Sequence, residues 1–171
     1  MDELERLSKD EFQYAAKSPL TIVLDNVRSM HNVGSVFRTC DAFLVEKIYL
    51  CGFTPTPPHR EIQKTALGAT ESVAWEAIAE TPLLINKLKQ EGYLVYAVEQ
   101  THNSIALNQF KPSKDSKIAL VFGNEAEGVS EETILACDGA IEIPQFGSKH
   151  SFNISVSAGI VLWDIFNKMK G

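Results

Sequence analysis

The sequence predicts an α/β protein whose mostly parallel sheet is flanked by helices, and three observations lead to this class. Five short apolar runs, rich in β-branched residues and bounded by polar ones, are typical of buried strands. Helical patterns lie between these runs, and strands that alternate with helices build a parallel sheet. The 171 residues, 44% hydrophobic and 22% charged, fit one globular domain and exclude disordered and fibrous classes.

The predicted elements follow one another along most of the chain. The strands cover residues 20–25, 47–52, 93–98, 117–123 and 139–144. The helices between them cover residues 33–44, 82–90 and 131–137, the second beginning near Pro82 and the third capped by Ser130. A last helix over residues 153–168 has apolar side chains on more than one face. We therefore expect this helix to pack on the sheet and on a second subunit, in a homodimer.

Two segments lie outside this alternation. Residues 1–18 are expected to form a helical extension, with a short amphipathic helix over residues 4–17, within a single domain that spans residues 1–171. Residues 54–60, with the sequence TPTPPHR, are too rich in proline for a central strand. We predict an exposed loop there, which ends in His59 and Arg60.

Charge, cysteine content and hydropathy exclude several classes of protein. With 16 basic and 22 acidic side chains the net charge is −6, so any nucleic-acid site must be local. Three scattered cysteines without a CxxC pair predict no disulfide framework and no zinc site. No metal-ligand spacing links the four histidines, which are His31, His59, His102 and His150. No run reaches the roughly 20 apolar residues of a membrane span, so we expect a cytoplasmic protein without a membrane partner.

The first unusual segment, residues 26–38 (NVRSMHNVGSVFR), follows the first predicted strand. Asn32, Gly34 and Arg38 lie where a loop becomes a helix. Amides at a helix start, with a guanidinium one turn later, can together bind a phosphate. The alternative is a capped helix with a solvent-exposed arginine.

The second segment, residues 123–128 (GNEAEG), follows the most apolar strand. Its terminal glycines allow a ligand to approach the backbone, and Glu125 offers a carboxylate to position that ligand. The spacing is not GxGxxG, so the fingerprint of a dinucleotide-binding Rossmann fold is absent. The alternative is a plain strand-to-helix turn in which Glu125 and Glu127 favour the dipole of the next helix.

The third segment, residues 143–160, places Lys149, Ser151 and Asn153 between the last strand and the last helix. A serine hydrolase is disfavoured, because His150 and Ser151 are adjacent and the GxSxG elbow is missing. Ser151 and Asn153 are better explained as a helix cap and as hydrogen-bonding partners of a ligand. Because ligands bind at the carboxyl ends of the strands in open α/β sheets, we expect all three segments to converge on one crevice.

Taken in this order, the three segments resemble motifs 1, 2 and 3 of the SpoU/TrmH family of RNA ribose 2′-O-methyltransferases, in the SPOUT class. The asparagine, glycine and arginine of motif 1 are matched by Asn32, Gly34 and Arg38. The FGxExxG of motif 2 is matched by Phe122, Gly123, Glu125 and Gly128. The IP dipeptide and the S-hydrophobic-N pattern of motif 3 are matched by Ile143, Pro144, Ser151, Phe152 and Asn153.

The resemblance covers the chain from about Leu20 onwards and implies more than the residues show alone. It implies a C-terminal trefoil knot, S-adenosylmethionine as the cofactor, and a homodimer with the active site near the interface. The residues it places around the cofactor are Val98, Glu99, Gln100, Gly123, Asn124, Gly128, Ile143, Pro144, Ser151 and Phe152. Its catalytic set consists of Arg38, Asn32, Glu125, Ser151 and Asn153. Because a guanidinium gives up its proton reluctantly, we assign Arg38 to the RNA phosphate and the attacking ribose.

The implied activity is methyl transfer to a ribose 2′-hydroxyl of structured RNA, with transfer RNA as the first candidate and ribosomal RNA as the alternative. A catalytically silent RNA-binding protein of the same fold would not need the whole catalytic set, and a base methyltransferase would not need motif 1 with its arginine. At a net charge of −6, RNA must meet a restricted basic surface. The candidates for that surface are Arg28, His31, His59, Arg60, Lys64 and Lys149.

Overall fold

A seven-stranded sheet forms the centre of the computed structural model, which describes residues 7–149 and 151–171. The strand order is β3-β2-β1-β6-β4-β7-β5, and every pairing between these strands is parallel. The strands are β1 (Ser18–Asp25), β2 (Val45–Cys51), β3 (Trp75–Ile78), β4 (Tyr93–Val98), β5 (Ile105–Ala106), β6 (Lys117–Phe122) and β7 (Gly139–Glu142). The predicted α/β class with a mostly parallel sheet is confirmed.

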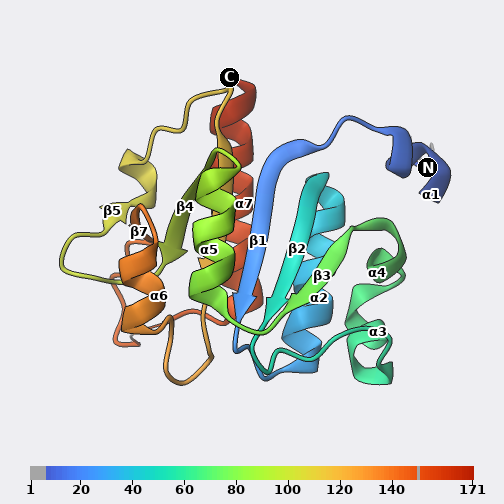
Figure 1. Ribbon diagram of the computed structural model, residues 1–171, viewed down its shortest axis with the longest axis horizontal. Helices are drawn as coiled ribbons and strands as arrows, with labels where there is room; N and C mark the ends of the chain where they lie inside the picture. Colours follow the sequence, from blue (N-terminus) through green and yellow to red (C-terminus); the bar gives the residue numbers. More distant parts are fainter. Residues whose placement is uncertain (1–6, 150) are drawn as a thin grey trace.

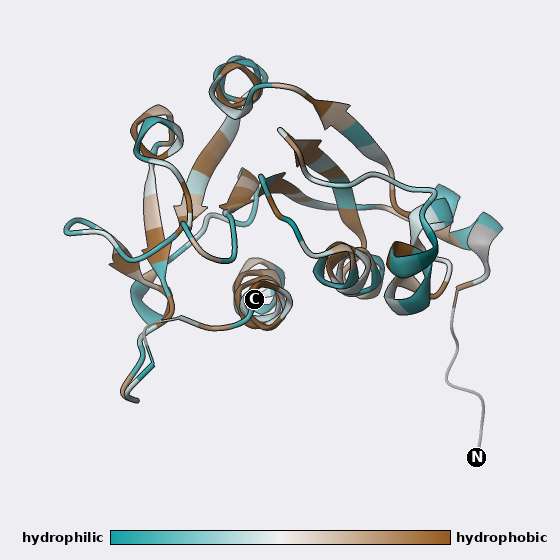
Figure 2. Ribbon diagram, turned by 90° about the horizontal axis from the view of Figure 1, so that it is seen from below, coloured by the Kyte–Doolittle hydropathy of each residue, from teal (hydrophilic) through white to brown (hydrophobic). Residues whose placement is uncertain are grey.

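The helices cover both faces of this sheet, which gives three layers. The helices are α1 (Lys9–Tyr14), α2 (Met30–Ala42), α3 (Arg60–Ala66), α4 (Ala69–Ser72), α5 (Thr81–Gln90), α6 (Glu131–Ala136) and α7 (Ile154–Lys170), with a short 3₁₀ turn at Leu107–Gln109. Helices α5 and α6 lie on one face, and α2 and α7 lie side by side on the other (Figures 1 and 2). The short helices α3 and α4 flank α2 at the β3 edge (Figure 1).

Alternate side chains of the central strands fill the two layers of the core. Along β1, Leu20, Ile22 and Leu24 join the apolar cluster under α2 and α7, whereas Val23 joins the cluster under α5 and α6. All four side chains are fully buried. This alternation follows from the period of two in a strand, since successive side chains point to opposite faces of the sheet.

A buried carboxylate fixes the carboxyl end of β1. Asp25 is 3% exposed and accepts hydrogen bonds from Thr81 Oγ1 (2.5 Å), at the start of α5, and from Thr133 Oγ1 (3.1 Å), in α6. Asn26 Nδ2 donates a third bond to it (3.2 Å). These bonds satisfy a group that is costly to bury unpaired. They also hold the α5 and α6 starts beside the strand ends where the polar segments lie.

The five predicted strands are confirmed, and their ends differ from the expectation by at most two residues. Strands β3 and β5, of four and two residues at or near the sheet edges, were not expected because so short a segment shows no clear periodicity. The proline-rich loop does end at His59 and Arg60, but these residues are the N-cap and first residue of the unexpected helix α3. In the N-terminal extension the helix covers Lys9–Tyr14, and residues 1–6 lie outside the described part of the chain.

The structure bears on the predictions about cysteines, metal sites and membrane spans. Cys40, Cys51 and Cys137 are unpaired, and burial raises the pKa of Cys51 and of Cys137 to about 12, so both thiols stay protonated at neutral pH. Within the described ranges, no group of three or more His, Cys, Asp or Glu side chains could hold a metal ion. His150 lies outside those ranges. Of the helices described, none is long and apolar enough to cross a bilayer.

The close approach of α2 and α3 depends on a glycine. A Cβ at Gly34 would lie 2.1 Å from Thr65 Oγ1 and 2.2 Å from the Ile62 carbonyl oxygen. We expect Gly34→Ala to lower the free energy of unfolding by about 1–3 kcal/mol, because α3 must shift to admit the methyl group. Urea titration measures this. At Gly147 the same methyl group meets open space, so Gly147→Ala is the control and should change stability by less than about 0.5 kcal/mol. An equal stability of both variants would contradict the packing role.

Candidate functional site

A cleft of about 540 Å³ opens at the carboxyl ends of β4, β6 and β7 and at the start of α7. These strand ends lie at the lower edge of the molecule in Figure 1 and face the viewer in Figure 2. The segments that follow β4, β6 and β7 are far apart in sequence, and the parallel pairing of the strands brings them together. The lining residues are Val98, Glu99, Gln100, Gly123, Asn124, Glu125, Ala126, Glu127, Gly128, Glu142, Ile143, Gln145, Ser151, Phe152, Asn153, Ile154 and Ser157.

The segment after β6 is a closed turn. The backbone of Asn124 and that of Gly128 exchange two hydrogen bonds of 2.9 Å, and Asn124 Oδ1 accepts from the amides of Ala126 (2.9 Å) and Glu127 (3.1 Å). A Cβ at Gly123 would lie 2.2 Å from the carbonyl carbon of Gly128. The turn's own backbone therefore requires glycine at position 123, whereas the sequence had suggested the approach of a ligand as the reason.

Glu125 extends from this turn to the segment before α2. Its Oε2 accepts from the Arg28 amide (2.9 Å), and its Oε1 accepts from the Ser29 amide (3.0 Å) and from Asn32 Nδ2 (3.1 Å). Helix α6 begins only at Glu131. The carboxylate therefore joins motif 2 to motif 1, and the alternative in which it favours the dipole of the next helix is wrong.

The same network continues into motif 3. Asn153 Nδ2 donates to Asn32 Oδ1 (3.2 Å), and Asn153 Oδ1 accepts from the amide (2.9 Å) and the hydroxyl (2.6 Å) of Ser155. Asn153 is therefore the N-cap of α7. Ser151 does not have the expected capping role, since it lies two residues before the cap, and its exposed side chain lines the cleft.

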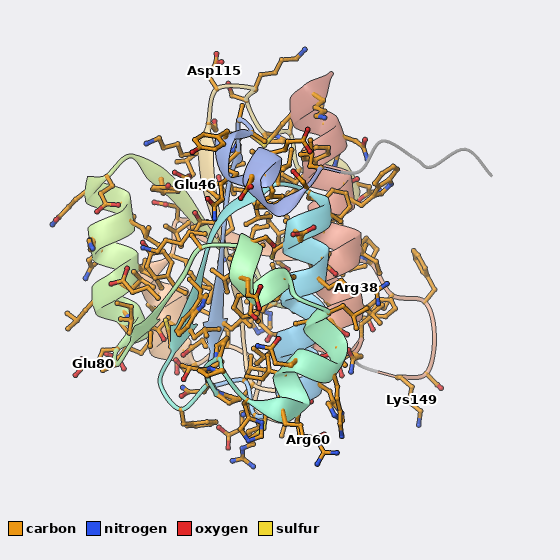
Figure 3. All side chains as sticks on the ribbon, turned by 90° about the vertical axis from the view of Figure 1, so that its right-hand side faces the viewer. Arg38, Glu46, Arg60, Glu80, Asp115 and Lys149 are labelled. Carbon is orange, nitrogen blue, oxygen red and sulfur yellow. The ribbon has the colours of Figure 1, made fainter. Side chains whose placement is uncertain are left out.

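Arg38 lies outside this cleft, as does the rest of the first segment, residues 26–38. The expected convergence of all three segments on one crevice is therefore wrong for the first, which is joined to the cleft only by hydrogen bonds. Ser29 caps α2, which begins at Met30, three residues before the predicted start. Arg38 is consequently in the third turn of the helix, and the expected position one turn after the start is wrong. Its exposed side chain lines a separate hollow of about 340 Å³, together with Ser35, Thr39, Lys64, Thr65, Ser155 and Val156. Figure 3 shows Arg38 beside α7, above Arg60 and Lys149.

The first turn of α7 separates the two compartments and also links them. Asn153 and Ser157 face the cleft, while Ser155 and Val156 face the hollow that contains Arg38. Because Ser155 is bonded to Asn153, and Asn153 to Asn32, a chain of hydrogen bonds runs from Glu125 to the wall of the Arg38 hollow. The position of Arg38 relative to the cleft is thus set by the packing of α2 on α7.

The cleft is acidic. Glu99, Glu125, Glu127 and Glu142 line it, and none of the described residues in its lining is a lysine or an arginine. Partial burial raises the pKa of Glu125, but the amides of Arg28 and Ser29 and the Asn32 side chain outweigh this effect and leave the pKa below its ordinary value. The carboxylate is ionised at neutral pH. Such a surface favours a positively charged ligand over a phosphate-bearing one.

A protein-family model, described as the SpoU rRNA Methylase family, matches residues 19–163 of the chain. The chain belongs to this family. A 23S rRNA (guanosine-2′-O-)-methyltransferase, RlmB of Neisseria meningitidis, is 29% identical to the SpoU chain over 154 residues, which are 90% of this chain and 60% of RlmB. A tRNA (guanosine(18)-2′-O)-methyltransferase of Thermus thermophilus is 32% identical over 145 residues, which are 85% of this chain and 73% of that enzyme.

Solved structures of RNA methyltransferases share the fold of this chain. The crystal structure of an AdoMet-bound rRNA methyltransferase from Sinorhizobium meliloti superposes with a TM-score of 0.79 at 26% identity, over 90% of this chain and 58% of that chain. The SpoU chain thus spans less than two thirds of the length of some of its relatives.

The SpoU cleft contains nearly all of the residues expected around a cofactor. Of that set, Pro144 alone is absent from the lining. The lining residues outside the expected cofactor and catalytic sets are Ala126, Glu127, Glu142, Gln145, Ile154 and Ser157. Two features of the sequence could have predicted members of this group. Glu142 is the last residue of a strand, and the residues that follow this strand line the cleft. Ser157 lies four residues after Asn153 and therefore on the same face of the helix.

The six basic candidates do not form one free surface. His31 Nε2 lies 2.8 Å from Glu61 Oε2, and Lys64 Nζ lies 2.7 Å from Glu61 Oε1. His59 Nδ1 accepts from the Glu61 amide (3.2 Å) as the N-cap of α3. The other three side chains are exposed at the carboxyl side of the sheet: Arg28, Arg60 and Lys149.

The lowered pKa of Glu125 gives a pH-dependent contribution to stability. Because the folded-state pKa is below the unfolded value of about 4.3, this contribution is present above the unfolded pKa and is lost as the pH falls through the folded pKa. We expect Glu125→Gln to lower the free energy of unfolding by about 1 kcal/mol at neutral pH, a value reduced by solvent exposure. The difference from wild type should disappear in acid.

Urea titration of both proteins between neutral and acid pH measures this difference. Glu127→Gln is the control, since Glu127 lies in the same turn and its carboxylate has no hydrogen-bond partner among the described residues. A deficit of Glu125→Gln that stays constant with pH would contradict the role of the charge.

Proposed function

We propose that the chain transfers a methyl group from S-adenosylmethionine to a ribose 2′-hydroxyl of structured RNA, with transfer RNA as the first candidate. One observation carries the proposal: the hydrogen-bonded chain from Glu125 through Asn32 to Asn153 joins motif 1 to motifs 2 and 3, and motifs 2 and 3 line the cleft. The relatives from Neisseria and Thermus are 2′-O-methyltransferases of rRNA and tRNA, respectively. The rRNA relative makes ribosomal RNA the alternative substrate.

The cleft fits S-adenosylmethionine in size and in charge. A volume of about 540 Å³ lies within the usual range for sites of small molecules. The sulfonium and the ammonium of S-adenosylmethionine are cations, and the four glutamates of the lining are suited to them. When bound, this cofactor supplies an activated methyl group. The residues proposed to hold it are the expected set that lines the cleft: Val98, Glu99, Gln100, Gly123, Asn124, Gly128, Ile143, Ser151 and Phe152.

The residues of the three motifs have different proposed roles. Glu125 and Asn32 hold the segment before α2 against the cleft, and Asn153 fixes the start of α7. The exposed hydroxyl of Ser151 is free to bond the cofactor or the ribose at the rim of the cleft. Arg38 is proposed to bind an RNA phosphate and the ribose, since its planar fork can hold two oxygens at once. Alignment of the hydroxyl supplies much of the rate enhancement.

A homodimer and a knotted C-terminal part belong to the same proposal. Trp163 (61% exposed) lies on α7 beside Phe43, and the centroids of these rings are 6.1 Å apart, while the Phe166 ring lies 5.4 Å from that of Phe43. This apolar face is proposed to contact a second copy of the chain. The expected trefoil knot is supported by the strand order, because β6 lies between β1 and β4, and α7 follows β7 yet packs on α2.

We also propose that residues 1–171 form one catalytic domain, with residues 1–18 as its extension. The family model covers residues 19–163, and the single sheet takes strands from Ser18 to Glu142, which supports this organisation. A cytoplasmic location is supported by the three unpaired cysteines.

The function is tested by incubating the protein with S-adenosylmethionine labelled in its methyl group and with RNA from cells that lack the gene. Transfer RNA and ribosomal RNA are supplied separately, and the products are digested to nucleosides and analysed by mass spectrometry. We expect the label on a ribose 2′-oxygen. Label on a base would indicate a base methyltransferase. RNA binding without methyl transfer, and without affinity for S-adenosylmethionine in calorimetry, would indicate a silent RNA-binding protein.

Because Arg38 lies outside the cleft, its loss should separate catalysis from cofactor binding. We expect Arg38→Ala and Arg38→Lys each to slow methyl transfer by on the order of a hundredfold, since lysine keeps the charge but loses the fork. Single-turnover methylation and calorimetry with S-adenosylmethionine measure the two effects. Near-normal transfer by the lysine variant would show that Arg38 acts only as a charge, and loss of cofactor affinity would place it in the cofactor site.

The apolar face of α7 predicts the oligomeric state. Light scattering at micromolar concentration should give a mass near twice 18.9 kDa. Trp163→Glu should shift the mass towards 18.9 kDa, because a charge is costly to bury at an apolar interface. Leu83→Glu on α5 is the control, since Leu83 is equally exposed on the opposite layer (63%). A wild-type mass near 18.9 kDa would contradict the homodimer.

A further inference from the structure

An exposed aromatic ring stands at the carboxyl end of β2. Phe53 is 57% exposed, although large apolar side chains of folded proteins are usually buried. Its backbone is firmly held: the Phe53 amide donates to Asn26 Oδ1 (3.2 Å), and Gly52 supplies the positive φ of +60° that the turn requires. The buried hydroxyl of Thr54 lies 2.7 Å from the Cys51 carbonyl oxygen and accepts from the Val27 amide (3.0 Å). The ring is therefore presented to solvent by a rigid turn.

This turn is bonded to the motifs of the cleft. Asn26, which holds the Phe53 amide, accepts at its carbonyl oxygen from Asn124 Nδ2 (2.8 Å), and Asn124 lines the cleft. The guanidinium of Arg28 lies 5.7 Å from the centroid of the Phe53 ring. The amide of Arg28 is in turn bound by Glu125 (2.9 Å). Phe53 and Arg28 are thus linked to the cleft by the residues that join motifs 1 and 2, although neither of them lines it.

The chemistry of this pair suits single-stranded nucleic acid. Aromatic rings stack on unpaired bases, and a neighbouring guanidinium binds the phosphate or stacks beside the ring. The turn leads into residues 54–60, which end in His59 and the exposed Arg60, so the ring lies beside polar and basic groups. The exposed apolar face of α7, by contrast, combines several apolar side chains and suits a protein partner.

We propose that Phe53 is a positioning residue that stacks on an unpaired nucleobase of the RNA next to the target ribose, with Arg28 on the adjoining phosphate. The proposal rests on the proposed function and adds a residue outside the three motifs. The stacked base fixes the strand outside the cleft. Phe53 therefore acts through RNA binding, and the binding of S-adenosylmethionine does not depend on it.

Three variants test this role with transfer RNA and ribosomal RNA from cells that lack the gene. Phe53→Leu removes the ring and should weaken RNA binding and raise KM for RNA by about tenfold, with kcat and the affinity for S-adenosylmethionine unchanged. Phe53→Tyr keeps the ring and should restore both the affinity for RNA and the KM for RNA. The control is Tyr14→Leu, which removes an aromatic ring of 89% exposure on α1 and should change neither value. Equal affinities of the leucine variant and the wild type, or failure of tyrosine to restore RNA binding, would overturn the proposal.

A direct readout of stacking uses Phe53→Trp. Its fluorescence, after subtraction of the wild-type signal from Trp75 and Trp163, should be quenched by a short single-stranded oligoadenylate. Inorganic polyphosphate, which has the charge without the bases, should not quench it. Equal quenching by both probes would show that Phe53 senses only phosphate and would overturn the stacking role.

The experiments distinguish failure of the proposed methyl transfer from failure of the stacking role. If the wild-type protein methylates no RNA but the base-specific quenching and the weak binding of Phe53→Leu are observed, methyl transfer is wrong and the stacking role stands. If the wild type methylates RNA and Phe53→Leu has an unchanged KM, the stacking role is wrong and methyl transfer stands.

Discussion

The carboxylate of Glu125 is the contact on which the arrangement of the site depends. It binds the amides of Arg28 and Ser29, which lie 97 and 96 residues away along the chain, and the side chain of Asn32. Asn32 binds Asn153 in turn, so a single side chain unites the segments that follow β1 and β6 with the start of α7. Charge-assisted bonds of this kind are stronger than neutral ones, and their common acceptor makes the three segments interdependent.

This arrangement separates two electrostatic environments. The cleft on one side of the α7 start is lined by four glutamates, and the hollow on the other side contains Arg38 and Lys64 among hydroxyl groups. An acidic cleft attracts a cationic methyl donor and repels the phosphates of RNA, whereas the hollow has the opposite preference. If the proposed function holds, charge thus directs S-adenosylmethionine to the cleft and the RNA phosphates to the hollow. The proposed stacking of a base on Phe53 would add a neutral contact outside the acidic cleft.

Much of the architecture was predictable because it depends on local periodicity. The strand Lys117–Phe122 is buried from its second residue onwards, so a continuous apolar run marks it in the sequence. The start of α2 was misplaced because two of the three residues of its first turn, His31 and Asn32, are polar, and only Ser29 marks the beginning of the helix. Strand β3 and helix α3 were missed because a short edge strand and a seven-residue helix depend on tertiary contacts for their stability.

The sequence by itself determined the α/β class and the three polar segments, because each segment follows a strand whose end is visible as a change from apolar to polar residues. Most residues of the cleft were expected from the resemblance of these segments to the SpoU/TrmH motifs. Only the tertiary structure decided which of these residues meet. It separated Arg38 from Glu125 and Asn32, because one helix cap shifts the start of α2 and thereby the turn on which Arg38 lies. It also linked the Phe53 turn to Asn124 of the cleft, through bonds from Asn26 to residues far away in sequence. Such contacts have no local signature, because their partners are set by the order of the strands in the sheet.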